Sequence, residues 1–229
     1  MAPMASMAPM AAPLLLRQLQ GLLSGIYDAP VRYDVHDFLF TDRAWLPDHI
    51  RATDADEQVL VLEEHGATSV GVYLDPALLE RLSAADPLRA LNAANIADYW
   101  TALEGVSHFL YLAWNAGHDR AVSLLELELQ AEIDKYVASW WLLRQQQPER
   151  FPAELHPLLF ARARVDATLA AGRLELYRHA NDYASRFCRR LSRQLSGAAR
   201  SRGEALVELR RFYRLSRERK VRHIQRHDG

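Results

Sequence analysis

Cysteine is almost absent from this sequence of 229 residues, because Cys188 is its single example. One cysteine excludes an internal disulfide bond and fits a reducing compartment, so we expect a cytoplasmic protein. Long apolar runs are absent too, and no stretch approaches the roughly 20 residues that a membrane span needs. The residues that interrupt the best candidates are Glu104, His108, Glu126 and Glu128.

Several widespread catalytic motifs are also absent. The sequence has no glycine-rich phosphate loop, no His-Glu-x-x-His, no Gly-x-Ser-x-Gly and no Cys-x-x-Cys. These absences argue against the commonest enzyme classes, but they leave open whether the protein is an enzyme.

Lysine is scarce, and positive charge is concentrated at one end of the chain. Residues 186–229 hold 14 of the 28 Lys and Arg residues but only 4 of the 29 Asp and Glu residues, a formal charge of +10. Residues 1–185 therefore carry −11. Such an asymmetry indicates either a polyanionic partner or docking of the basic segment on the acidic remainder of the chain.

Two long amphipathic helices are predicted at the centre of the sequence. The first runs from about Asn95 to Ala116 and is expected to end at Gly117 in the left-handed conformation. The second begins after Ser123, where Ser123-Leu124-Leu125-Glu126 has the form of a capping box, and ends near Gln147. We expect an antiparallel helical hairpin with Leu129 and Trp140 buried and Glu126 exposed.

The N-terminal part is predicted to contain three strands. The segments are Val31–Phe40, Val59–Leu62 and Val70–Leu74, of which the last two read as an antiparallel hairpin. The predicted fold class is therefore α+β and predominantly helical, with a small three-stranded antiparallel sheet packed on a helical bundle built around the long helical hairpin.

The chain divides into four predicted segments. These are a disordered leader (1–13), a small α/β portion (14–92), a helical bundle (93–200) and a basic C-terminal helix (201–229). We expect that last helix to be ordered through about Leu215 and looser beyond, where the sequence is almost wholly charged. Removal of 217–229 is then expected to leave folding intact.

Acidic residues and one histidine recur on the facing sides of the two central helices. If the helices run antiparallel, a count from the connecting loop brings His108 level with Glu132 and Glu128, and Glu104 level with Lys135. A histidine facing carboxylates between packed helices is typical of metal sites in bundles. The candidate ligands of a divalent metal are Glu104, His108, Glu128 and Glu132. Ion pairs that set the helix register are the alternative.

Basic residues of the last predicted helix are the candidates for contact with a polyanion, either a nucleic acid or an acidic protein. They are Arg210, Arg211, Arg214, Arg217, Arg219, Lys220, Arg222 and Arg226. On one continuous helix they are spread around the axis, and no aromatic residue follows Tyr213, so stacking platforms for single-stranded nucleic acid are missing.

Two functions follow as hypotheses. The first is an interaction or regulatory protein that contacts a polyanion through its basic C-terminal helix. The alternative is a small helical enzyme, or a metal or small-ligand binder, that uses the His/Glu cluster. The oligomeric state, the ligand and the true start codon are not specified by the sequence.

Overall fold

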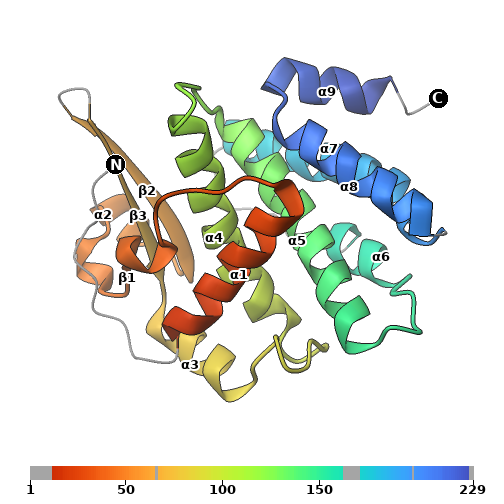
Figure 1. Cartoon of the computed structure of the whole chain (residues 1–229). Coiled ribbons are helices and arrows are strands. Elements are labelled where there is room, and N and C mark those ends of the chain that lie inside the picture. Colours follow the sequence, from red (N-terminus) through yellow and green to blue (C-terminus); the bar gives the residue numbers. More distant parts are fainter. Residues whose placement is uncertain (1–11, 65–66, 162–170, 198, 227–229) are drawn as a thin grey trace. The chain divides into compact units, whose positions relative to one another are not determined.

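The computed structural model describes residues 12–64, 67–161, 171–197 and 199–226, and it is mostly helical with one small sheet (Figure 1). The predicted α+β, predominantly helical class is confirmed. No helix among the described residues has the length and apolar character needed to cross a membrane. The predicted leader lies outside the described residues except for its last two positions, which begin the first helix.

The chain forms two compact units. Unit 1 comprises residues 1–24 and 30–119, and unit 2 comprises residues 25–29 and 120–229. The two predicted central helices fall in different units, so their packing as an antiparallel pair stays a prediction.

Unit 1 contains the sheet and the first long helix. Its elements are most of α1 (Ala12–Tyr27), the 3-10 helices η1 (Val35–Phe38) and η2 (Arg43–Trp45), the strands β1 (Leu39–Phe40), β2 (Glu57–Glu64) and β3 (Ala67–Leu74), and the helices α2 (Asp48–Arg51), α3 (Pro76–Ala84) and α4 (Ile96–Ala116). Asp75 caps α3 through the backbone N–H of Ala77, with Pro76 in the first turn, as the Asp-Pro pair predicts.

The sheet is mixed, so the prediction of three antiparallel strands is wrong in one pairing. β2 and β3 form the predicted antiparallel hairpin, with Val59 opposite Val72. β3 then occupies the centre in the order β1-β3-β2, and β1 pairs with it in parallel. Parallel pairing follows because β1 and β3 both run opposite to β2. Val70, Val72 and Leu74 of the central strand are buried.

The predicted first strand is also shorter than expected. Only Leu39–Phe40 is extended, because the Asp34 carboxylate accepts a hydrogen bond from the backbone N–H of His36 at 2.9 Å and starts the 3-10 helix η1. A local side-chain cap of this kind competes with strand pairing.

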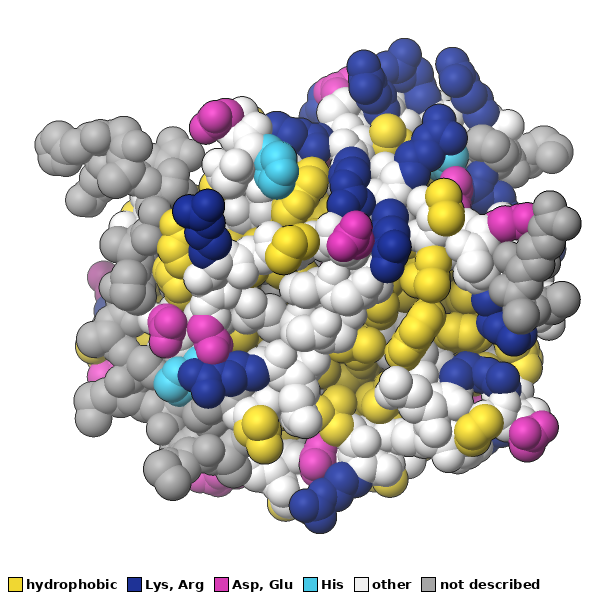
Figure 2. Space-filling view, in the orientation of Figure 1, with side chains coloured by type: hydrophobic (Ala, Val, Ile, Leu, Met, Phe, Trp, Pro, Cys, Tyr) yellow, Lys and Arg dark blue, Asp and Glu magenta, His cyan; other side chains and the backbone are white. Residues whose placement is uncertain are grey.

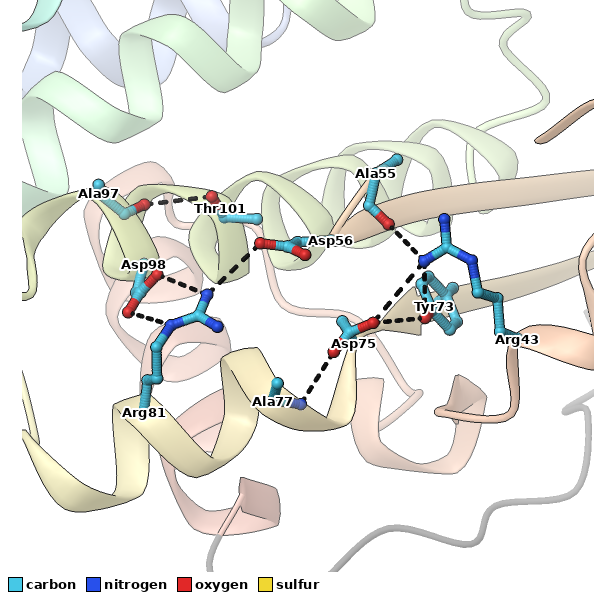
Figure 3. A network of polar contacts seen from close by, with 10 residues as sticks. All are labelled: Arg43, Ala55, Asp56, Tyr73, Asp75, Ala77, Arg81, Ala97, Asp98 and Thr101. Carbon is cyan, nitrogen blue, oxygen red and sulfur yellow. Dashed lines mark hydrogen bonds and ion pairs between the residues drawn. The ribbon is translucent and has the colours of Figure 1, made fainter. Parts of the chain in front are cut away.

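Two arginine-centred clusters hold the ends of the strands to the neighbouring helices of unit 1 (Figure 3). Arg81 of α3 makes two hydrogen bonds of 2.9 Å to Asp98 of α4 and a third, of 3.4 Å, to Asp56 just before β2. Arg43 lies 3.4 Å from the hydroxyl oxygen of Tyr73, which donates to Asp75. Both clusters fix the register between strands and helices rather than presenting a reactive group.

The first long helix matches its predicted span but not its predicted ending. Gly117 follows α4 with φ −66° and ψ −7°, which is right-handed geometry. The left-handed residue is Asp119, with φ 51°. Turn hydrogen bonds therefore continue past Gly117, and the last of them joins the backbone N–H of Asp119 to the carbonyl of Ala116.

Unit 2 is helical. Its elements are α5 (Leu124–Gln146), α6 (Leu155–Phe160), α7 (Ala171–Leu195), α8 (Ala199–Tyr213) and α9 (Arg217–Gln225). α5 packs on α6 and α7, and α7 packs on α8 and α9. Leu129 and Trp140 of α5 are 1% and 4% exposed, so their predicted burial is confirmed.

The capping box at the start of α5 is present as predicted, but the expected exposure of Glu126 is wrong. The carboxylate of Glu126 accepts hydrogen bonds from the backbone N–H and the hydroxyl of Ser123, at 3.0 and 2.9 Å. This folds the side chain back over the helix end, and Glu126 is only 5% exposed.

The C-terminal helix is two helices rather than one. α8 ends at Tyr213 and α9 starts after Ser216, whose extended backbone (φ −71°, ψ 164°) is typical of a helix N-cap. The expected loosening beyond Leu215 is also wrong, because α9 buries Lys220 and Ile224, at 0% and 2% exposure. A sequence that looks fully charged thus carries one inward-facing stripe.

Candidate functional site

A group of potential metal ligands lies in unit 1 where β2 meets α4. Glu57 begins β2, while Glu104 and His108 are one turn apart on α4. One ligand atom from each of the three side chains lies within 4.8 Å of the other two. Nδ1 of His108 is 3.8 Å from Oε1 of Glu57, and these two side chains are 6% and 12% exposed.

A glycine allows the helix to come this close to the strand. Gly105 follows Glu104 on α4, and a Cβ atom built there would lie 3.1 Å from Cγ1 of Val72 and 3.2 Å from Cγ of Glu57. Any larger side chain would push α4 away from β2 and β3. The site therefore depends on the close approach of the α4 backbone to β2 and β3, which the glycine permits.

The structure brings together half of the predicted metal ligands and adds one that the sequence did not single out. Glu104 and His108 belong to the group, and Glu57 joins them from the sheet. Glu128 and Glu132 belong to unit 2 and are not part of it. Glu132 instead accepts a hydrogen bond from Nζ of Lys135, on its own helix, at 2.8 Å. Glu57 was missed because sequence spacing relates residues of one helix but not a helix to a strand.

Two carboxylates and one imidazole so close together need a compensating positive charge. Two partly buried carboxylates repel each other unless a proton or a cation lies between them. A protonated His108 would serve, and so would a divalent ion bound by its neutral ring. Imidazole nitrogen with carboxylate oxygen is a donor set that suits Zn²⁺, Fe²⁺ or Mn²⁺.

The structure sorts the predicted polyanion-contacting residues of unit 2 into inward and outward groups. Arg210 donates to the carbonyl of Ile26, and Arg214 donates to the carbonyls of Tyr27 and Asp28. These arginines cap the C-terminal end of α1, where carbonyl groups lack helical partners. Lys220 is buried and donates to Gln130, so it is not part of an exposed basic surface.

Four other arginines line a groove in unit 2 with a cavity of about 540 Å³. This arginine groove is lined by Glu208, Arg211, Leu215, Arg219, Arg222, His223 and Arg226. Figure 2 shows Lys and Arg side chains gathered over the part of this face where Figure 1 places α9. The remaining predicted residue, Arg217, forms an ion pair with Glu218.

The groove is lined by two sets of residues, one on each side of the break between α8 and α9. Glu208, Arg211 and Leu215 are three and four positions apart on and just after α8, and Arg219, Arg222 and Arg226 have the same spacing on and just after α9. Residues at this spacing share one face of a helix. Leu215 and Arg219 are also four positions apart, so on a single continuous helix the two sets would form one stripe. The break places this stripe on two helices that line a groove. The spread of charge around the axis comes from the predicted residues outside the groove, which are Arg210, Arg214, Arg217 and Lys220.

Glu208 does not cancel the charge of the four groove arginines. Its Oε1 lies 2.5 Å from a guanidinium nitrogen of Arg190 and 2.5 Å from Nε2 of His223. Arg190 comes from α7, outside the lining of the groove. Its positive charge compensates the carboxylate and leaves the groove with a formal excess of positive charge.

Cys188 is not part of either site. Burial raises the pKa of its thiol well above the ordinary value, and the nearby charges of Glu132 and Asp134 act in the same direction. The arginines beside it in sequence therefore do not activate it, and the buried thiol is a packing residue of α7.

Comparisons of the chain with protein family models, with curated proteins and with solved structures gave no match. The function must therefore be argued from the two sites themselves.

Proposed function

We propose that unit 1 binds one divalent transition-metal ion through Glu57, Glu104 and His108. The observation that carries this proposal is that one ligand atom of each side chain lies within 4.8 Å of the others, on two different elements, with His108 buried and the two glutamates partly buried. Bound there, the ion would link the start of β2 to the middle of α4.

The donor set favours a transition metal over Ca²⁺ or Mg²⁺. Those hard cations prefer oxygen ligands, six or more in the case of Ca²⁺, whereas one of the three ligands here is an imidazole nitrogen. Three protein ligands leave a fourth position of a tetrahedral Zn²⁺ site for water or for another group. Because His108 is buried and the two glutamates are only partly exposed, we assign the ion a role in holding sheet and helix together rather than a catalytic one.

Metal analysis of the purified chain tests the proposal. After incubation with Zn²⁺ and removal of unbound ion, we expect about one equivalent per chain by mass spectrometry. Glu57→Gln keeps the size of the side chain but removes its charge. It should lower Zn²⁺ affinity by at least ~10-fold, the lower bound for loss of even a residue that only supports a metal ligand. Glu80→Gln is the matched control, since Glu80 is an exposed glutamate of α3.

Either of two results would overturn the metal proposal. One is the absence of tight Zn²⁺, Fe²⁺ or Mn²⁺ binding by the unaltered chain. The other is equal affinity in the Glu57→Gln and Glu80→Gln variants, which would place any bound ion elsewhere. In both cases the cluster would be a buried ion pair of His108 with glutamate.

A second candidate function is binding of a polyanion in a reducing, cytoplasmic environment. It is supported by the arginine groove of unit 2, and the single buried cysteine is compatible with the compartment. Nucleic acid and acidic protein are the two partner classes suggested by the charge distribution. If phosphates are neutralised, affinity should fall steeply between ~50 and 200 mM salt because condensed counterions are released.

A further inference from the structure

The arginine groove contains guanidinium groups that have no partner in the part of unit 2 that the structure describes. The side chains of Arg211, Arg219 and Arg226 make no hydrogen bond or ion pair with described residues, and all three are exposed. Arg222 uses only its Nε, which donates to the backbone carbonyl of Glu218 at 3.2 Å. Four arginines thus converge on one concavity with most of their donors available.

The size of the groove is that of a small-molecule site. Its volume of about 540 Å³ lies within the ~300–1,000 Å³ range of ligand pockets. The α9 stripe from Arg219 to Arg226 extends about 10 Å along the helix, at 1.5 Å per residue. A long nucleic acid would extend past both ends of this stripe, so the groove would contact only a small part of the nucleic acid.

The residues that line the groove favour ligands with phosphate groups over ligands with aromatic rings. Guanidinium binds phosphate and carboxylate oxygens through two parallel hydrogen bonds. The groove has no Phe, Tyr or Trp in its lining, so it offers no platform on which a base would stack. Four arginines need several negative charges close together, and adjacent phosphate groups of one small molecule supply them.

We infer that the arginine groove binds a compact ligand that carries several adjacent phosphate groups. This inference rests on the proposed binding of polyanions and names the class of ligand. Arg219, Arg222 and Arg226 hold the phosphates from α9, and Arg211 holds them from α8. Arg190, which lies outside the lining of the groove, forms an ion pair with Glu208. The carboxylate of Glu208 is thereby neutralised and does not repel the ligand.

Titration calorimetry of the full chain with inorganic tripolyphosphate tests this assignment at a fixed salt concentration. We expect saturable binding of one equivalent. The double variant Arg219→Gln/Arg222→Gln should bind at least ~10-fold more weakly, because two charge-assisted contacts are lost. The matched control Arg189→Gln/Arg193→Gln removes the same charge from exposed positions of α7 and should bind as the unaltered chain does.

A duplex oligonucleotide, titrated in parallel, separates the ligand class from the broader function. If the chain binds the duplex in a salt-sensitive manner but not tripolyphosphate, the small-ligand inference is wrong while polyanion binding stands. If neither binds, both fail. Equal loss of tripolyphosphate binding in the two double variants would show a diffuse charge effect and would also overturn the assigned groove. Circular dichroism of each variant establishes that it is folded.

Discussion

The buried amino group of Lys220 donates a hydrogen bond to Oε1 of Gln130 at 2.6 Å, joining α9 to α5. Gln130 in turn donates to Asp134 at 2.8 Å, and the hydroxyl of Tyr27 donates to the same carboxylate at 2.5 Å. Nζ of Lys220 also lies 5.0 Å from the ring centre of Phe212. A lysine in the most basic part of the sequence is therefore a core residue of unit 2.

The stability of unit 2 should depend on pH through Lys220. Burial lowers the pKa of Lys220 to about 7, while the charges of Glu126 and Asp134 oppose this shift and that of Arg120 adds to it. In the unfolded chain the pKa is about 10.4. Between these values the unfolded state binds more protons, so the free energy of unfolding rises with pH, by up to about 1.4 kcal/mol per pH unit from this group.

Urea denaturation at pH 7, 8 and 9 measures this slope. Lys220→Met should lose it, because methionine does not titrate. Arg219 is an exposed neighbour of Lys220 on α9. Arg219→Met therefore removes a positive charge from an exposed position and should keep the slope of the unaltered chain. A slope that persists unchanged in Lys220→Met would show that Lys220 is charged throughout this range in the folded protein.

Gly105→Ala should destabilise unit 1, although alanine is the better helix former. An alanine in a helix interior gains about 1 kcal/mol over glycine. At position 105, however, the new Cβ would lie 3.1 Å from Cγ1 of Val72, a fully buried side chain that would have to shift by a few tenths of an ångström. Overpacking of this kind costs roughly 1–3 kcal/mol, so we expect a net loss in denaturant unfolding.

Gly21→Ala is the control for this prediction. Gly21 lies in α1, and nothing is within 4 Å of a Cβ built there. This variant should therefore show only the increase in stability that alanine brings to a helix interior. If Gly105→Ala is as stabilising as Gly21→Ala, α4 does not press on β3 at this point and the geometry of the proposed metal site is looser than the structure indicates.

Leu129→Ala should lower the stability of unit 2 by ~2–5 kcal/mol, the usual cost of truncating a buried leucine. Leu129 is 1% exposed in the middle of α5. Leu124, at the start of the same helix, is 39% exposed, and Leu124→Ala should cost under ~1 kcal/mol. Thermal or urea unfolding of the two variants compares them directly, and similar losses would show that α5 is peripheral to the core.

Helix boundaries were largely predictable because short side-chain signals encode them. Asp75 before Pro76 and Ser123 three residues before Glu126 act within one turn of chain, so sequence spacing alone identifies them. At Ser216, which divides the C-terminal helix, the side chain makes no capping hydrogen bond, and the sequence does not predict this break. Asp34 likewise replaced a predicted strand with a 3-10 turn.

The candidate sites were less predictable because they depend on packing between elements. Glu57 is 47 positions before Glu104, and only the pairing of β2 with β3 and the approach of α4 bring the two together. One signal was present: a glycine in a helix interior is unfavourable, and Gly105 beside Glu104 indicates that something packs closely there. No comparable signal marked Lys220 as buried, since its pairing with Gln130 spans 90 positions.

Removal of residues 217–229 should destabilise unit 2, contrary to the expectation from sequence that this segment is dispensable for folding. α9 buries Ile224 at 2% exposure and provides the lysine that satisfies Gln130, so its loss would expose apolar surface of unit 2 and leave a buried acceptor without its donor. Ile224→Ala alone should cost ~2–5 kcal/mol. Arg222→Ala, on the exposed face of the same helix, should cost under ~1 kcal/mol. Urea unfolding of the three variants checks this order, and a deletion variant as stable as the full chain would mean that α9 contributes its arginines to the groove without supporting the fold.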